Sequence, residues 1–280
     1  MLRVRRAAAL VALVAVIAAG CGSAASSDED PGVAISVETT VDDAPVTTVA
    51  PTTTVAPTTT ADPAVPTTTV RPPAEHETFV AHIKPDVAEI VAYAEPGGGA
   101  IVPFEFAITN PTYWGNPLVL MVLDRTPDGE WLEVQIPVRP NDTTGWIPAA
   151  WADVESHFVR AEVDLTNRSV RVWDGDELVA QTAAVIGKES TPTPLGRFFV
   201  NDLVEKWEGS AYGPYILSLS AFSEALDTFA GGIPVIAIHG TNRPELVGGA
   251  HSNGCIRIPN DVITFLADQV PMGTPVDIVA

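Results

Sequence analysis

The chain has 280 residues, a formal net charge of −20 and a pI of about 4.4. Binding to nucleic acid requires a basic face that neutralises phosphates, so this acidic balance argues against a nucleic-acid partner. Many of the 25 prolines stand in one segment near the N-terminus. That leaves roughly 200 residues for folding, enough for one medium domain and one small one.

Residues 1–20 have the pattern of a secretory signal peptide. Three arginines precede an apolar run over residues 7–19, which is too short to span a bilayer comfortably. The run ends in Ala-Ala-Gly-Cys, which resembles a bacterial lipobox with Cys21 as the lipid-attachment residue. The alternative is ordinary cleavage near Ala24 or Ala25. We favour the lipobox and expect an exported lipoprotein, held at the outer face of the cytoplasmic membrane by its lipid anchor.

Residues 21–76 predict a disordered Thr/Pro-rich stalk. They repeat variations of Thr-Thr-Thr-Val-Ala-Pro and contain no aromatic residue. Such a composition cannot bury enough apolar surface to form a core. Proline favours the extended polyproline conformation, so the stalk would be long enough to carry the folded domains into the cell wall.

Residues 77–153 predict a small β module. An apolar run over residues 118–123 has strand length, and residues 131–136 alternate as a half-buried strand does. The segment ends in Gly-Trp-Ile at 145–147, which resembles a strand of bacterial SH3-like modules. Such a module would either grip wall peptide or serve as a spacer or brace. We favour the second reading, because Trp131 and Trp146 are explained equally well as core residues.

Residues 154–280 predict a mainly β domain with one good helix. Alternating apolar residues surround the tight-turn pair Asp174-Gly175, and residues 233–238 form a continuous apolar run. After Pro259, an amphipathic pattern predicts a helix capped by Asn260 or Asp261. A second, shorter helix is expected over residues 221–229.

The last third of the chain holds a histidine and a cysteine in a suggestive arrangement. His239 ends the apolar run, and Cys255 follows sixteen residues later in a turn flanked by glycine. A cysteine nucleophile needs a base that is near in space, and a strand that ends in histidine can supply one. The chain has two cysteines. If Cys21 is acylated, Cys255 is left as a free thiol rather than half of a disulfide.

These residues resemble the catalytic signature of the L,D-transpeptidase (YkuD-type) family. The chain reads His-Gly at 239–240 and Ser-Asn-Gly-Cys-Ile-Arg at 252–257, and a second matching segment, Thr-Pro-Thr-Pro-Leu-Gly-Arg-Phe, stands at 191–198. Many family members have histidine where this chain has Asn253. The resemblance covers roughly residues 159–279. It implies a YkuD-like β-sandwich catalytic domain with a short helix, preceded by the SH3-like β module and the disordered stalk.

The resemblance also implies a role for each site residue. Cys255 would be the nucleophile and His239 its general base. The Gly240 carbonyl would orient the imidazole, and the backbone N–H groups of Gly254 and Cys255 would face the developing oxyanion. The other implied members of the site are Asn253, grouped with the orienting and oxyanion residues, and Ser252 and Arg257, which would bind substrate or support the turn.

The implied activity is peptidoglycan L,D-transpeptidation, which forms 3→3 cross-links between stem peptides through a cysteine thioester. The alternatives are an L,D-carboxypeptidase, another Cys-His enzyme such as a sortase or an NlpC-type peptidase, and a wall-binding lipoprotein without activity. A zinc site of His239, His251 and Cys255 lacks a fourth ligand of suitable spacing. His251 is either a second pocket residue or a loop residue, and we favour the loop. We expect no metal, no cofactor and a monomer.

Overall fold

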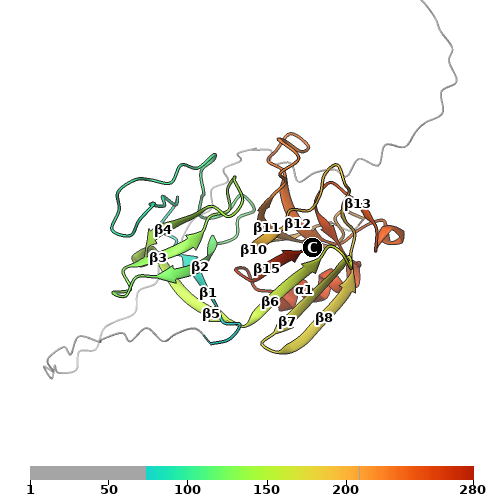
Figure 1. The fold of residues 1–280 in the computed structure, drawn as a ribbon, viewed down its shortest axis with the longest axis horizontal. Helices are drawn as coiled ribbons and strands as arrows, with labels where there is room; N and C mark the ends of the chain where they lie inside the picture. The colour runs from blue at the N-terminus through green and yellow to red at the C-terminus, as the bar shows by residue number, and fades with distance from the viewer. Residues whose placement is uncertain (1–73, 208) are drawn as a thin grey trace, which may run out of the picture.

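The computed structural model describes residues 74–207 and 209–280. The predicted signal peptide, the lipid-attachment residue Cys21 and nearly all of the predicted stalk lie outside these residues. The described chain forms two β domains that lie side by side (Figure 1). Within this part of the chain, no helix is long and apolar enough to cross a membrane.

The first domain is a five-stranded antiparallel sheet in the order β4-β3-β2-β1-β5. Its elements are β1 (Thr78–Ile83), β2 (Val119–Arg125), β3 (Trp131–Gln135), β4 (Thr144–Pro148), the 3₁₀ turn η1 (Ala149–Trp151) and β5 (Ala152–His157). The strands predicted over residues 118–123 and 131–136 are therefore confirmed. The likeness of this domain to SH3-like modules, and the predicted boundaries of the domains, stay predictions.

The second domain is built on an eight-stranded sheet in the order β14-β12-β11-β10-β15-β6-β7-β8. In chain order its elements are β6 (Val159–Asp164), β7 (Ser169–Asp174), β8 (Glu177–Ala183), β9 (Ile186–Gly187), β10 (Gly196–Glu205), β11 (Tyr215–Phe222), β12 (Val235–His239), η2 (Pro244–Leu246), β13 (Ala250–Ser252), β14 (Ile256–Arg257), α1 (Asn260–Gln269) and β15 (Pro275–Val279). The short strands β9 and β13 pair separately. The prediction of a mainly β fold with one short helix is confirmed.

The eight-stranded sheet folds over and packs on itself. One hydrophobic cluster contains residues from both of its ends, such as Val163 and Val172 from one end and Ile236 and Ile238 from the other. Because side chains alternate between the two faces of a strand, each strand buries the side chains of one face in this shared core. Helix α1 adds Ile263 and Leu266 to the same cluster, as its amphipathic pattern predicted.

The two domains are joined through strand β10. Phe198 and Phe199 are neighbours and both are fully buried, but Phe198 packs in the core of the second domain and Phe199 in that of the first. Strand alternation explains this, since consecutive side chains point to opposite faces. Gln135 of the first domain donates to the Arg197 carbonyl at 2.8 Å. The first domain is thus packed closely against the second.

The prediction of a short helix over residues 221–229 is wrong. Strand β11 continues to Phe222, and residues 223–228 are irregular with bends, followed by an isolated β-bridge at Phe229. The main chain of Phe222 is held extended by Asn141 of the first domain, which accepts from its N–H and donates to its carbonyl, both at 2.9 Å. A contact with a distant residue therefore overrides the local helical pattern.

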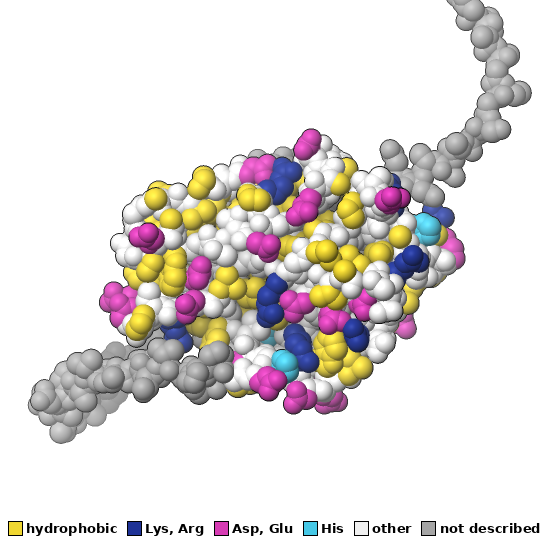
Figure 2. Space-filling model, viewed as in Figure 1, with side chains coloured by type: hydrophobic (Ala, Val, Ile, Leu, Met, Phe, Trp, Pro, Cys, Tyr) yellow, Lys and Arg dark blue, Asp and Glu magenta, His cyan; other side chains and the backbone are white. Residues whose placement is uncertain are grey.

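Acidic side chains are spread over the visible face of the two domains rather than gathered in one place (Figure 2). Lysine and arginine side chains stand among them. On this face the positive charges are thus not gathered into a basic patch.

Candidate active site

Strand β12 places His239 against the second domain's smaller hydrophobic cluster. Ile236 and Ile238 point into the main core, so Ala237 and His239 face the opposite side. On that side Ala237 packs with Val204, Tyr212 and Ile216. The imidazole is fully buried, with the Tyr212 ring edge-on at 4.9 Å between centroids.

The Gly240 carbonyl determines which nitrogen of His239 is basic. It lies 2.6 Å from Nδ1. Because a carbonyl oxygen only accepts, Nδ1 carries the hydrogen, and Nε2 is the basic nitrogen of the neutral ring. This is the orienting contact that the family resemblance implied.

Asn260 holds the segment after His239, which the sequence did not predict. Its Oδ1 accepts from the Thr241 N–H at 2.7 Å instead of capping α1, which begins after Pro259 without a side-chain cap. A Cβ on Gly240 would lie 2.3 Å from this oxygen. Glycine is thus required at position 240 by the close approach of Asn260, and the predicted capping role of Asn260 is wrong.

Strand β14 brings Cys255 to the same face of the sheet. It pairs in parallel with β12, matching Ile256 with Ile238 and Arg257 with His239. By this register Cys255, one residue before Ile256, lies opposite Ala237. The thiol is half-buried, packs against the cluster around Ala237, and donates to the Val235 carbonyl at 3.8 Å. The structure therefore places Cys255 in the turn just before β14 and His239 at the end of the neighbouring strand β12, with both side chains on one face of the sheet.

The turn at residues 252–255, here called the cysteine turn, is braced from within. Ser252 Oγ donates to the Cys255 carbonyl at 2.6 Å and accepts from the Gly254 N–H at 3.1 Å. Gly254 has φ of +120°, and a Cβ there would lie 2.7 Å from Ile236 Cδ1. This position therefore requires glycine. In this structure the Gly254 N–H serves the turn, so the implied oxyanion role is left to the Cys255 N–H.

A second brace comes from residues 191–194, the threonine segment, which corresponds to the upstream motif. Thr193 Oγ1 donates to the Gly254 carbonyl at 2.8 Å and accepts from the Gly187 N–H at 2.9 Å. Thr191 Oγ1 lies 3.4 Å from Asn253 Oδ1 and 3.3 Å from the Ser252 carbonyl. The Asn253 side chain is thus turned toward the threonine segment. The upstream motif is explained as a clamp on the cysteine turn.

The remaining predicted residues lie as follows. Arg257 is nearly buried, and its main chain exchanges hydrogen bonds of 3.0 Å and 2.8 Å with Val185. This position favours support of the turn over contact with substrate. His251 is exposed on β13 and is therefore part of a strand, not of a loop. In the described part of the chain, no three His, Cys, Asp or Glu side chains come together as metal ligands.

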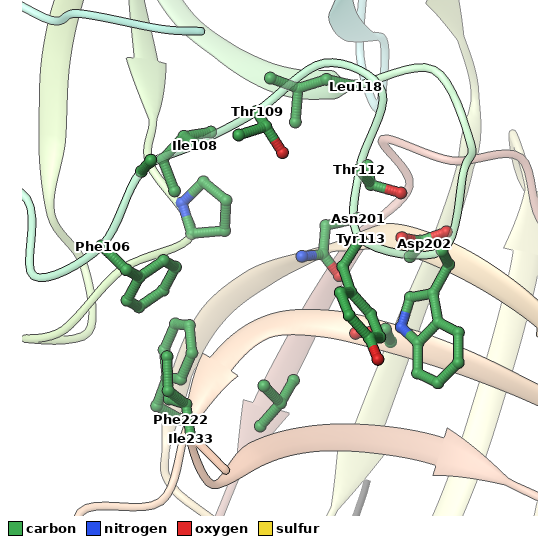
Figure 3. A pocket seen from close by; sticks show the side chains of 15 residues that line it. Phe106, Ile108, Thr109, Thr112, Tyr113, Leu118, Asn201, Asp202, Phe222 and Ile233 are labelled. Atoms are coloured by element: carbon green, nitrogen blue, oxygen red, sulfur yellow. The ribbon is translucent and has the colours of Figure 1, made fainter. Parts of the chain in front are cut away.

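Sequence reasoning missed the contribution of the first domain to this site. Residues 109–118, here called the N-terminal loop, reach over β10 and place Trp114 against the cluster that also contacts Cys255. Lys206 Nζ lies 4.5 Å from the centre of the Trp114 ring. Figure 3 shows the pocket between this loop and the second domain. No pattern in the sequence links residues 109–118 to residues 201–255, so this contact was not predictable.

A buried histidine beside a half-buried thiol, both on a rigid sheet, is typical of enzymes that transfer acyl groups through a cysteine. Residues 159–278 match the family model of the YkuD L,D-transpeptidase catalytic domain. The predicted YkuD-type catalytic domain is therefore confirmed for these residues.

Two curated relatives agree with this assignment. The YkuD protein of Bacillus licheniformis, assigned as an L,D-transpeptidase, is 37% identical over 119 residues, which cover 42% of this chain and 64% of the relative. YkuD of Bacillus subtilis is 39% identical over 93 residues, or 33% and 49% of the two chains. This chain thus spans less than two thirds of the length of either relative.

Among solved structures, the catalytic domain of the Enterococcus faecium L,D-transpeptidase, determined by NMR, is 26% identical. The match covers 43% of this chain and 96% of that one, with a TM-score of 0.34. The family assignment rests on the sequence matches rather than on this superposition.

Proposed function

We propose that the protein is a peptidoglycan L,D-transpeptidase that forms 3→3 cross-links between stem peptides through a thioester on Cys255. The observation that carries this proposal is the placement of Cys255, just before β14, and His239, at the end of β12, on one face of the sheet and inside the domain that matches the family model. No metal or cofactor takes part in the proposed chemistry.

In the proposed reaction, Cys255 Sγ attacks the carbonyl carbon that follows the L-centre of diaminopimelate in a tetrapeptide stem. His239 Nε2 takes the thiol proton and returns it to the nitrogen of the leaving D-alanine. The product is a thioester on Sγ. The amine of a second stem then attacks this thioester, its proton passes to His239, and the thiol is regenerated as the new amide forms.

The surroundings of Cys255 support these roles. The Gly240 carbonyl keeps Nε2 available as the base, and the two braces around the cysteine turn hold the main-chain N–H of Cys255 in place. A donor that is fixed before the reaction stabilises a developing oxyanion without reorganisation.

The proposal predicts a covalent adduct when the purified protein meets a carbapenem, which acts as an acyl donor. Intact-mass spectrometry should show one added molecule, and peptide mapping should place it on Cys255. Cys255→Ser should lose adduct formation and stem-peptide turnover by at least about 10³-fold, since a hydroxyl is far less acidic than a thiol.

Two histidines provide a matched control for this experiment. His239→Ala should slow acylation by roughly 10²-fold, whereas His251→Ala should leave it unchanged. An adduct elsewhere, or wild-type turnover by Cys255→Ser, would refute the nucleophile. With tetrapeptide stems, a cross-linked dimer supports transpeptidation, and tripeptide as the only product would show that water is the acceptor, as in a carboxypeptidase.

We also propose that the mature chain is exported and held at the outer face of the cytoplasmic membrane by a lipid on Cys21. The support is the sequence Ala-Ala-Gly-Cys after an apolar run. Cys21→Ala should release the mature chain from membranes or leave it unprocessed, as cell fractionation and immunoblotting will show. Unchanged processing and attachment in this variant would contradict the anchor.

A further inference from the structure

Outside the catalytic pair, the most informative feature is the pocket between the two domains. It has a volume of about 340 Å³ and lies between the N-terminal loop and strands β10, β11 and β12. At one edge it is bordered by Val235, whose carbonyl accepts a hydrogen bond from the Cys255 thiol. The pocket therefore begins beside the nucleophile.

Most of the pocket wall is apolar. Phe106, Ile108 and Phe222 lie at one end in Figure 3, while Tyr113 and Asp202 lie at the other. Such walls fit an aliphatic group and exclude water from its polar end.

A β-bulge supplies the polar end of the pocket. Asn201 and Asp202 are consecutive on β10 and would ordinarily point to opposite faces. The register of β10 against β11 shifts between Val200 and Asp202, and both side chains line the pocket. A bulge of this kind re-aims a side chain, and bulges are frequent beside active sites.

Asp202 is a buried acid without a cation. The residue is 3% exposed, and its carboxyl accepts from Asn116 Nδ2 and from the Leu203 N–H. Among the described residues no charged group acts on it, and burial raises its pKa above the ordinary value although hydrogen bonds from Thr112, Asn116 and the Leu203 N–H lower it. A carboxylate in such surroundings is costly unless a positive charge is added.

The same pocket contains a second acceptor. Asn201 Oδ1 is buried and has no hydrogen-bond partner among the described residues. A buried carbonyl oxygen of this kind costs free energy until a donor reaches it. The acid and the amide oxygen at the end of this apolar pocket would both be satisfied by a cation with several N–H donors, carried at the end of an aliphatic chain.

The position of Asp202 relative to Cys255 sets the length of that aliphatic chain. Asp202 pairs with Ser218, and Ser218 pairs with Ala237. Cys255 lies opposite Ala237 on the next strand, so the four residues form a row across one face. Three strand spacings separate the main chains of Asp202 and Cys255 by roughly 14 Å. A ligand whose carbonyl lies at Cys255 can therefore place a cation at Asp202 only if it carries that cation on an extended aliphatic side chain.

We propose that this pocket binds a primary ammonium at the end of an aliphatic side chain, with Asp202 as its counter-ion and Asn201 Oδ1 as a second acceptor. On the proposed function, on which this identification of the ligand rests, the group is the side-chain ammonium of the diamino acid whose carbonyl Cys255 attacks. The N-terminal loop then makes the first domain part of the substrate-binding site.

The test compares two neutral-backbone probes, Nα-acetyl-lysine methylamide and its norleucine isostere, titrated into the purified protein and followed by NMR. The lysine probe should bind on the order of tenfold more tightly, because it adds a hydrogen bond between charged groups. This preference should decrease as the pH falls, since a protonated carboxyl does not attract an ammonium. Equal binding of the two probes by the unmodified protein would overturn the proposal.

Substitutions assign the preference to one residue. Asp202→Asn should abolish it while leaving norleucine binding intact. Asp164→Asn makes the same change at another buried carboxyl of this domain, which bonds to Asn167 away from the pocket. This variant should keep the preference for the lysine probe. A preference that survives in Asp202→Asn would refute the assignment.

The probes also separate this inference from the proposed function. A lysine preference without acylation of Cys255 would support the pocket and reject the transpeptidase. Normal acyl transfer with equal affinity for both probes would support the transpeptidase and reject the pocket.

Discussion

Two segments flank Cys255, and they are held in different ways. The cysteine turn is fixed by hydrogen bonds within the second domain, from Ser252 and Thr193. The N-terminal loop belongs to the first domain and is tied to β10 through Asn116 and the packing of Trp114. The geometry of the nucleophile is thus internal to the catalytic domain, whereas the shape of the adjoining pocket depends on both domains.

This difference divides the chemistry between the two segments. Buried hydrogen bonds that close a short turn hold the reacting atoms to a narrow geometry, as acyl transfer requires. A loop from another domain can differ in sequence without disturbing the nucleophile, so it is suited to substrate selection. Changes in the cysteine turn should therefore affect acylation itself, and changes in the N-terminal loop should affect affinity for the donor.

Among substitutions that loosen one of the two segments without removing a catalytic group, the largest effect is expected for Thr193→Val. The valine removes one donor and one acceptor, leaving the Gly187 N–H and the Gly254 carbonyl without their bonds to this side chain. An unsatisfied buried group costs about 1–3 kcal/mol, so carbapenem acylation should slow roughly tenfold to a hundredfold as the turn loosens. Stopped-flow acylation and a thermal melt will measure both changes.

The control for this change is Thr182→Val on strand β8, where the Thr182 hydroxyl donates to the neighbouring Ala183 carbonyl at 3.2 Å. Acylation by this variant should be unaltered. Equal rates for Thr193→Val and the unmodified protein would show that the threonine segment does not fix the nucleophile.

A smaller and different effect is expected for Asn116→Ala. It removes the bond to Asp202 and the 2.9 Å bond to the Leu203 carbonyl, which together tie the N-terminal loop to β10. Acylation by a small carbapenem should change by less than about twofold, while KM for a peptide donor should rise several-fold, because lost ground-state contacts appear in KM.

Asn167→Ala provides the comparison, because it removes a similar bond of 2.7 Å to a buried carboxyl far from the pocket. Its KM for the peptide donor should equal that of the unmodified protein. If Asn116→Ala instead slows carbapenem acylation as strongly as Thr193→Val, the division between the two segments is wrong.

Much of the fold was predictable because it is recorded in local patterns. The alternation over residues 131–136 and the apolar run over residues 233–238 predicted strands, because side chains on a strand alternate between two faces and at least one face is buried. Helix α1 followed from apolar positions on one side, and its Ile263 and Leu266 are buried as expected. Where a distant contact intervened, as Asn141 does at Phe222, the local pattern misled.

The sequence by itself was enough to propose Cys255, His239 and their glycines as the site, because each of these residue types is demanded by chemistry or by a close approach at its own position. Only the tertiary structure brought Asn116 to Asp202, 86 residues further along the chain. It also turned Asn201 and Asp202 to one face and placed Trp114 against the hydrophobic cluster that Cys255 contacts. These arrangements depend on the packing of one domain against another and on a register shift between two strands. Both are properties of pairs of distant segments, and neither leaves a period or a spacing in the sequence.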